Sequence, residues 1–266
     1  MNTEDWIVIP IVCYPSYAFL LILADKASAF YASFIITSIG LGLVWLSYEK
    51  RKPPQPDIPT KVPTIPTDSP ILILGAIYGI VAAFAITQAL TILGQALDLD
   101  STKSIIEALY QRNNDVMLLL SFIFVSIPFY HGAAVFLSTR AAELLNEKKE
   151  KQIFFYFIML FSEAAFLYLL GSSVRSIETF TLWLIILIIV DLAWVLVARL
   201  AMNEKAIPPE WIHLDLLIIG FSVIFLLLPS MTGWNNYVIL SVILLARTIV
   251  DYKVAWHPIY FRIRRK

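Results

Sequence analysis

The chain has 266 residues, of which 59% are hydrophobic and 15% are charged, and its mean hydropathy is +0.77. Soluble domains are usually about 45–50% apolar, so this composition excludes an ordinary soluble protein and makes lipid the solvent for most of the chain. The 20 Lys and Arg residues balance the 20 Asp and Glu residues, so net charge predicts no nucleic-acid partner. The single cysteine, Cys13, excludes an intramolecular disulfide and a cysteine-built metal site.

Eight apolar stretches approach the roughly 20 residues that a helix needs to cross a bilayer core about 30 Å thick. They are too long and too uniformly apolar to be the strands of a membrane barrel. The predicted fold is therefore all-α, a polytopic bundle of about eight transmembrane helices in the cell membrane. The predicted spans cover residues 6–24, 28–47, 71–94, 116–138, 153–174, 178–199, 211–229 and 236–252.

Lys and Arg residues are distributed unevenly between the loops that connect these spans. One side of the membrane receives 15 of them and the other side only 4, namely Lys26, Lys103, Arg112 and Arg175, while Arg247 falls within the last span. Cytoplasmic loops carry the excess of basic residues in membrane proteins, so the first side is predicted to be cytoplasmic. With an even number of spans, both termini then lie in the cytoplasm.

The loops divide the chain into three predicted parts. Residues 50–69 are expected to form a proline-rich cytoplasmic linker, because closely spaced prolines favour an extended, polyproline-like chain. Residues 1–49 are expected to form an N-terminal transmembrane hairpin, and residues 70–266 a six-helix transmembrane core. On the outer side, the segment from Leu97 to Asp115 has apolar residues at near-helical spacing, which predicts an amphipathic surface helix.

Ionisable side chains inside the predicted spans are few. Each costs roughly 2.5–3.5 kcal/mol to insert at a helix centre, so such groups normally face the bundle interior and find partners there. With the predicted orientation, almost all lie at the membrane midplane or in its cytoplasmic half, where one cavity open to the cytoplasm can hold them. The candidate binding residues of this polar group are Tyr130, His131, Glu163, Asp191, Asp215, Arg247 and Asp251.

Two interpretations of these residues stay open. Polar side chains in lipid often only hold helices together, and Arg247 and Asp251, four residues apart on one helical face, can form an ion pair with that role. The functional interpretation is a path or pocket for a proton, an ion or a small polar solute. Glu163 has no charged residue three or four positions away on its own helix, so its partner is expected on another span, at His131 or Arg247.

Pro128 and Gly132 lie on either side of His131. Because proline removes one backbone N–H from a helix, this turn can unwind or kink and free backbone carbonyl groups. Such a kink can shape a binding site beside Tyr130 and His131, or it can only fit neighbouring helices together.

The sequence argues against several kinds of catalytic site. Three histidines are too few and too scattered for a multi-histidine iron site or a pair of haem ligands. The motifs of a serine-hydrolase elbow, a zincin and a P-loop ATPase are absent. We therefore predict no catalytic residue, no metal ligand and no cofactor, and an enzyme is the less favoured class.

Several different short motifs lie along the core. In chain order they are Phe129-Tyr130-His131-Gly132, Glu163, Asp191 with Trp194, Trp211, and Arg247-Thr248 followed by Asp251-Tyr252. In these motifs, residues 115–261 resemble an uncharacterised family of prokaryotic multi-pass membrane proteins with no established activity. The resemblance implies a membrane architecture without a reaction. In such relatives an Asn and an acidic residue usually follow the His-Gly pair, whereas here Ala133 and Ala134 follow it.

The leading functional hypothesis is permeation or binding of an ion or small polar solute through a cytoplasm-facing polar cluster. The first alternative is a non-catalytic structural or accessory subunit of a larger membrane complex, and the second is a membrane-embedded enzyme. The expected partners are the lipid bilayer and either other membrane proteins or further copies of the chain, with no nucleic acid.

Overall fold

The computed structural model describes residues 35–44, 70–97, 112–136, 144, 150–200, 207, 210–227 and 234–256. Within these residues the chain is helical apart from short turns, and they contain no strand, so the predicted all-α class is confirmed. The predicted linker at 50–69, the first predicted span at 6–24 and most of the predicted surface helix after Leu97 lie outside the described residues.

Six long helices follow one another from Pro70 onward in the described residues. Their ends fall within a few residues of the predicted spans, because an uninterrupted apolar run defines each of them. A shorter helix, Ile35–Val44, lies within the second predicted span. The long helices are α3 (Pro70–Leu97), α5 (Asn113–Phe136), α7 (Glu150–Gly171), α8 (Ile177–Leu200), α9 (Glu210–Leu227) and α10 (Trp234–Trp256).

Five of these helices, α3, α5, α7, α8 and α9, are long and apolar enough to cross a membrane, which fits an integral membrane protein. α10 is not among the five, because its second half carries Arg247, Asp251 and Lys253 and it is the least apolar of the long helices. The count of eight spans and the membrane orientation stay predictions.

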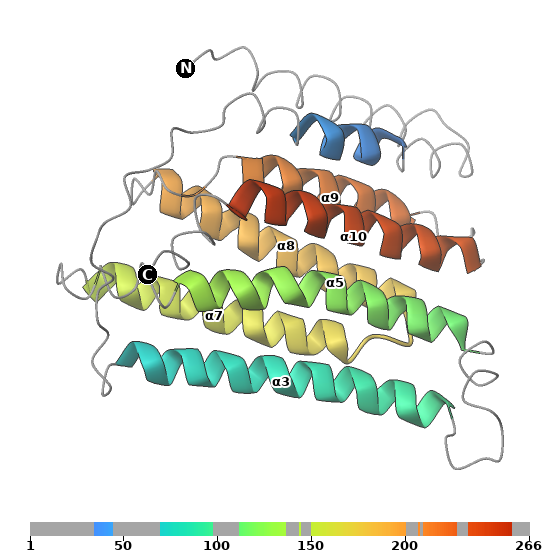
Figure 1. The fold of residues 1–266 in the computed structure, drawn as a ribbon, viewed down its shortest axis with the longest axis horizontal. Coiled ribbons are helices and arrows are strands. Elements are labelled where there is room, and N and C mark those ends of the chain that lie inside the picture. Colours follow the sequence, from blue (N-terminus) through green and yellow to red (C-terminus); the bar gives the residue numbers. More distant parts are fainter. Residues whose placement is uncertain are drawn as a thin grey trace.

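The long helices run side by side, and successive helices start from opposite ends of the bundle (Figure 1). α5 packs against α7 and α10, α8 packs against α7 and α9, and α9 packs against α10, so five helices close a ring. α3 lies outside this ring against α5 and α7. On the opposite side, Leu41 and Val44 of the short helix pack against apolar residues of α9 and α10.

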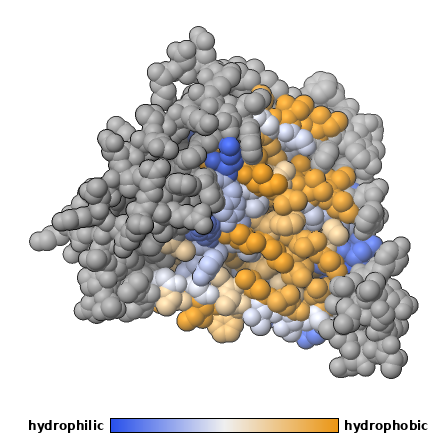
Figure 2. Space-filling view, viewed as in Figure 1, coloured by the Kyte–Doolittle hydropathy of each residue, from blue (hydrophilic) through white to orange (hydrophobic). Residues whose placement is uncertain are grey.

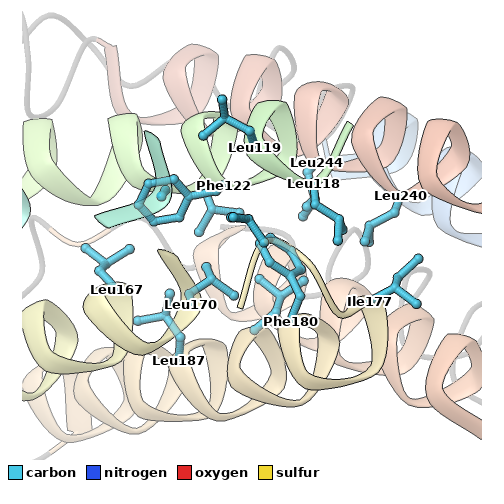
Figure 3. Packing of buried hydrophobic residues seen from close by; sticks show 14 of the residues in the cluster. Leu118, Leu119, Phe122, Leu167, Leu170, Ile177, Phe180, Leu187, Leu240 and Leu244 are labelled. Carbon is cyan, nitrogen blue, oxygen red and sulfur yellow. The ribbon is translucent and has the colours of Figure 1, made fainter. Parts of the chain in front are cut away.

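Large apolar side chains fill the inside of the ring (Figure 3). Phe122 of α5, Phe180 of α8 and Phe221 of α9 are fully buried there, among leucines of the neighbouring helices. Gly171 at the end of α7 allows α3 and α5 to come close. A Cβ atom at Gly171 would lie 2.7 Å from the backbone oxygen of Ala85 and 3.1 Å from the Phe122 ring.

Apolar side chains also cover much of the outside of the described helices (Figure 2). On α3, only 28% of the apolar span is buried inside the protein, and Ile80, Phe84 and Leu90 are among its exposed side chains. A contiguous apolar surface of this kind is unfavourable in water, whereas lipid tails solvate it. The outer surface therefore supports the membrane assignment.

A short turn at residues 172–175 joins α7 to α8. Ser176 caps α8, because the backbone N–H of Thr179 donates to the Ser176 hydroxyl oxygen at 3.3 Å and that of Phe180 donates to its carbonyl oxygen at 2.8 Å. So short a connection makes α7 and α8 antiparallel neighbours, and it places Glu163 and Asp191 on adjacent helices.

Candidate functional site

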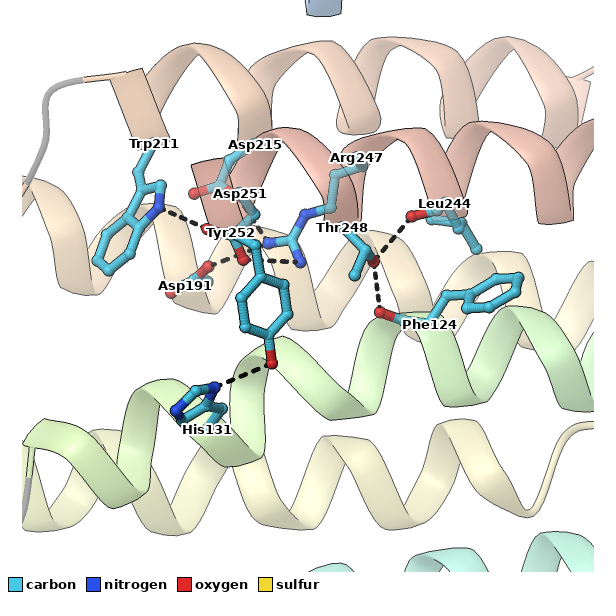
Figure 4. Close-up of polar contacts among 10 residues, drawn as sticks. All are labelled: Phe124, His131, Asp191, Trp211, Asp215, Leu244, Arg247, Thr248, Asp251 and Tyr252. Atoms are coloured by element: carbon cyan, nitrogen blue, oxygen red, sulfur yellow. Dashed lines mark hydrogen bonds and ion pairs between the residues drawn. The ribbon is translucent and has the colours of Figure 1, made fainter. Parts of the chain in front are cut away.

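Arg247 of α10 faces three aspartates that come from three different helices (Figure 4). Its guanidinium nitrogens lie 3.7 Å from Asp251 of α10, 3.8 Å from Asp215 of α9 and 3.9 Å from Asp191 of α8. These separations are within ion-pair range, although they are longer than direct hydrogen bonds. We call Asp191, Asp215, Arg247 and Asp251 the acidic cluster.

Helix geometry explains how these side chains meet. Arg247 and Asp251 are four residues apart on α10 and share a face, so the predicted ion pair between them is confirmed. α9 and α10 are neighbours in the ring, and α8 packs against α9, which brings Asp215 and Asp191 to the same face. Asp215 is almost fully buried, with 1% of its side chain exposed, whereas Asp191 keeps 16% exposed.

Aromatic side chains orient the cluster from two sides. The indole Nε1 of Trp211 donates a hydrogen bond to Asp251 at 2.6 Å, which fixes that carboxylate beside Arg247. The guanidinium carbon of Arg247 lies 5.4 Å from the centre of the Phe129 ring, a cation–π distance. Trp194 of α8 lies 6.3 Å from Trp211, centre to centre, so apolar rings border the charged groups.

The acidic cluster contains more negative groups than positive ones. Three aspartate carboxyls face one guanidinium, and a second oxygen of Asp215, Oδ2, is buried without a hydrogen-bond partner in the described part of the chain. Buried charges are stable only when they are paired and hydrogen-bonded. When all three carboxyls are ionised, the cluster therefore has net negative charge, which a further positive charge would balance.

Glu163 of α7 is buried, with 6% of its surface exposed, and α7 packs against α8, the helix that carries Asp191. Glu163 is close enough to Asp191 and Asp215 to interact with both electrostatically. The predicted pairing of Glu163 with His131 or Arg247 is not found among the described residues, where Arg247 lies within ion-pair range of the three aspartates and His131 contacts Tyr252.

Tyr78 of α3 is a polar neighbour of Glu163 that the sequence interpretation missed. Both Glu163 and Asp191 interact with it electrostatically, and only 3% of its surface is exposed. Its hydroxyl has no hydrogen-bond partner among the described residues. A tyrosine within a long apolar run gives no periodic signal of a polar contact, so only the packing of α3 on α7 reveals it.

Hydrogen bonds join α5 to α10 at three levels of the described helices. The Ser241 hydroxyl lies 2.7 Å from that of Ser121 and donates to the Met117 carbonyl oxygen at 2.8 Å. Thr248 donates to the Phe124 carbonyl oxygen at 2.6 Å, and His131 pairs with Tyr252 at 3.0 Å. The residue numbers increase together on both helices, so α5 and α10 run in the same direction. The chain reverses its direction four times between α5 and α10, which also makes these two helices parallel.

Pro128 explains why Thr248 donates a hydrogen bond to the Phe124 carbonyl oxygen. A proline has no N–H, so the carbonyl oxygen four residues earlier, that of Phe124, loses its helical donor. α5 nevertheless continues through Pro128, and Thr248 supplies the missing hydrogen bond from α10. The predicted loss of a helical donor at this turn is confirmed, and Thr248 of the neighbouring helix α10 donates to the released carbonyl.

His131 lies at the edge of the acidic cluster, whereas the contact described for Tyr130 is with α3. His131 is partly buried, with its Nδ1 atom 3.0 Å from the Tyr252 hydroxyl, and it interacts electrostatically with Asp251. The Tyr130 side chain is exposed, and its ring stacks on that of Tyr78 with centres 6.3 Å apart. Of the seven predicted binding residues, four therefore form the cluster, Glu163 and His131 interact electrostatically with its members, and Tyr130 contacts Tyr78 instead.

Within the described residues, no group of three or more His, Cys, Asp or Glu side chains is placed to hold a metal ion. The sequence matches no known family, and comparisons with curated proteins and with solved structures give no match. The resemblance noted from the short motifs thus stays a prediction, and functional inference rests on the acidic cluster itself.

Proposed function

We propose that the acidic cluster binds and exchanges a small cation, protons included, so that the protein works in cation permeation or binding. One observation carries this proposal: three aspartates, of which Asp215 and Asp251 are buried and Asp191 is partly exposed, share a single guanidinium. Because the surrounding helices are apolar, the surplus carboxyls need positive charge from a proton or another cation.

The negative charge of the acidic cluster indicates which class of solute the protein binds. An anion would add to the repulsion between the carboxylates, and a neutral solute would leave the surplus unbalanced. A cation would offset it, and Asp191, the most exposed of the three aspartates, is the natural point of entry. A cation is therefore preferred to the broader class of small polar solutes.

A purely structural cluster would be built differently. To hold two helices together, one carboxylate for one guanidinium is enough, and further buried carboxylates add desolvation cost without a partner. Asp251 already pairs with Arg247 and also accepts from Trp211. Asp191 and Asp215 exceed what that contact requires.

The depth of the acidic groups supports a route from one end of the bundle. Asp215 lies five residues after the start of α9 and Glu163 thirteen after the start of α7, and both helices start at the predicted cytoplasmic side. At 1.5 Å per residue these positions are about 8 Å and about 20 Å along their helices. We propose that cations enter from the cytoplasm and reach Glu163 near the membrane midplane.

Flux measurements in proteoliposomes test the proposal. Purified wild-type protein should speed the movement of protons, Na⁺ or K⁺ down an imposed gradient relative to empty liposomes. Asp215→Asn, which removes a buried charge but keeps the side-chain shape, should reduce that rate. Glu178→Gln is the matched control, because Glu178 is an exposed carboxylate in the first turn of α8. A wild-type rate equal to that of empty liposomes for all three cations contradicts the proposal.

A further inference from the structure

The two terminal nitrogens of the Arg247 guanidinium divide the acidic cluster into unequal parts. Asp251 contacts Nη1 at 3.7 Å. Asp191 and Asp215 both contact Nη2, at 3.9 Å and 3.8 Å. One carboxyl thus faces one nitrogen, whereas two carboxyls from different helices share the other. The three aspartates are therefore not equivalent, and their remaining contacts indicate how their roles differ.

Both oxygens of Asp251 have a partner in the described part of the chain. Oδ2 faces Arg247, which lies four residues earlier on the same helix, and Oδ1 accepts the indole N–H of Trp211 at 2.6 Å (Figure 4). An indole nitrogen only donates, and a donated hydrogen bond stabilises a carboxylate more than a neutral carboxyl. Trp211 therefore favours the ionised form of Asp251 and holds it against Arg247.

Asp215 has the opposite arrangement. Only 1% of its side chain is exposed, its Oδ1 faces the shared nitrogen, and its Oδ2 is buried without a hydrogen-bond partner among the described residues. An unsatisfied buried oxygen of this kind calls for a specific explanation, such as an exchanging ion. Asp191 faces the same nitrogen from α8 and keeps 16% of its side chain exposed, so this pair of carboxyls has a route to its surroundings.

We infer that Asp191 and Asp215 are the carboxyls that bind the exchanging cation. Asp251 is instead the permanent counter-ion of Arg247, and Trp211 is the positioning residue that keeps it there. This inference rests on the proposed function and identifies its binding site. Two carboxyls suit a proton or a monovalent cation, since Ca²⁺ takes roughly six to eight oxygen ligands.

Arg247 is a tethered competitor for this site, and for that reason the position of Asp251 matters. A guanidinium is always charged, so it attracts Asp191 and Asp215 as an incoming cation does. While Asp251 is held against Nη1, it balances the guanidinium charge, and an incoming cation can take the other two carboxyls. Without the hydrogen bond from Trp211, Asp251 holds Arg247 less firmly. Arg247 then competes more strongly, and the cation should bind more weakly at an otherwise unchanged site.

Trp211→Phe tests this role, because it keeps an aromatic ring and removes the N–H. Initial flux rates in proteoliposomes are measured at several concentrations of protons, Na⁺ or K⁺. The concentration that gives the half-maximal rate should rise about tenfold, the size expected for losing a hydrogen bond to a charged group, while the maximal rate is kept. Trp183→Phe is the matched control, since this partly buried tryptophan packs on Phe166, eight residues before Asp191 on α8. It should change neither quantity.

Asp251→Asn tests the division of roles by a second route. Asparagine keeps the side-chain shape but removes the counter-ion, so Arg247 is left to the other two carboxyls. The half-maximal concentration should again rise, by about tenfold or more, and flux should return at high cation concentration. Asp191→Asn and Asp215→Asn should instead lower the maximal rate. The thermal unfolding midpoint in detergent reports binding without flux, because a cation that binds the folded protein raises it.

The outcomes separate this assignment from the proposed function. If wild-type protein moves a cation and Asp215→Asn slows it, the proposed function stands. An unchanged half-maximal concentration in Trp211→Phe then overturns the role of Trp211, as does a lower maximal rate alone or a variant that no longer unfolds cooperatively. A loss of flux in Asp251→Asn as complete as that in Asp215→Asn overturns the division of roles. If wild-type protein moves no cation, both proposals fall.

Discussion

Thr248 donates a hydrogen bond to the carbonyl oxygen of Phe124 at 2.6 Å, and this is the carbonyl that Pro128 leaves without a helical donor. The Thr248 hydroxyl also lies 2.9 Å from the carbonyl oxygen of Leu244 on its own helix. Because Thr248 directly follows Arg247, this contact ties the part of α10 that carries the acidic cluster to the backbone of α5.

Thr248→Val should destabilise the protein by about 1 kcal/mol, because the variant keeps the side-chain shape but removes the donor to Phe124. The free energy of unfolding in detergent measures this loss. In the Pro128→Ala background the N–H at position 128 is restored and can satisfy Phe124, so Thr248→Val should cost less there. Thr91→Val is the control, since the exposed Thr91 hydroxyl bonds only within its own helix. Equal costs in both backgrounds would contradict this account of Pro128.

Arg247→Met should destabilise the protein by about 3–5 kcal/mol, because it leaves the buried Asp215 and Asp251 and the partly exposed Asp191 without their cation. Adding Asp251→Asn should recover only part of this loss, since Asp191 and Asp215 still repel each other. Unfolding in detergent at several pH values tests both statements, and the loss should shrink as the pH falls and carboxylates take up protons. Full recovery in the double variant would mean that Arg247 serves Asp251 alone. Arg175→Met, at an exposed turn, supplies the control.

Gly171→Ala should destabilise the bundle by about 1–3 kcal/mol, because the added methyl group meets the backbone of α3 at Ala85, which cannot move as a side chain can. Gly94→Ala is the matched control. A Cβ atom at Gly94 has nothing within 4 Å, so alanine there should be neutral or stabilising by roughly 0.5–1 kcal/mol through its helix propensity. Thermal unfolding of the two variants in one detergent makes the comparison, and equal midpoints would mean that α3 and α7 are less closely packed at Gly171 than described.

The orientation predicted from basic residues is tested by cysteine labelling. In a Cys13→Ser background, Pro56→Cys and Lys149→Cys should react with a membrane-impermeant reagent only after the cells are opened, whereas Ser101→Cys should react in intact cells. Labelling of Pro56→Cys in intact cells would reverse the orientation, and the acidic cluster would then open toward the outside.

Most of the fold was predictable because each long helix is a separate apolar run. Residues 177–200 and 210–227, for example, contain few breaks in hydrophobicity, so their lengths alone predicted α8 and α9. α10 was predicted as a span although charged residues interrupt it, and its composition does not place it among the five membrane-crossing candidates. Its role in the ring depends on contacts with α5 and α9 that no local pattern specifies.

The acidic cluster was predictable in part. Arg247 and Asp251 share a helix, so their spacing alone indicated a pair. That Asp191 and Asp215 would join them depends on which helices are neighbours, which hydrophobicity does not encode. The same limit explains why Glu163 was assigned the wrong partners and why Tyr78, on a helix distant in sequence, was not considered.

The central claim is that this polar group exchanges a cation, and the Glu163→Gln variant tests it most directly. Glutamine keeps the shape and hydrogen-bonding capacity of Glu163 but cannot ionise. The measurement is the initial rate of proton uptake by proteoliposomes under an imposed pH gradient, with equal amounts of folded wild-type and variant protein. We predict that the wild-type protein speeds uptake over empty liposomes and that Glu163→Gln lowers it to nearly the empty-liposome rate. A Glu163→Gln rate equal to that of the wild type would show that Glu163 is a packing residue and would contradict the account.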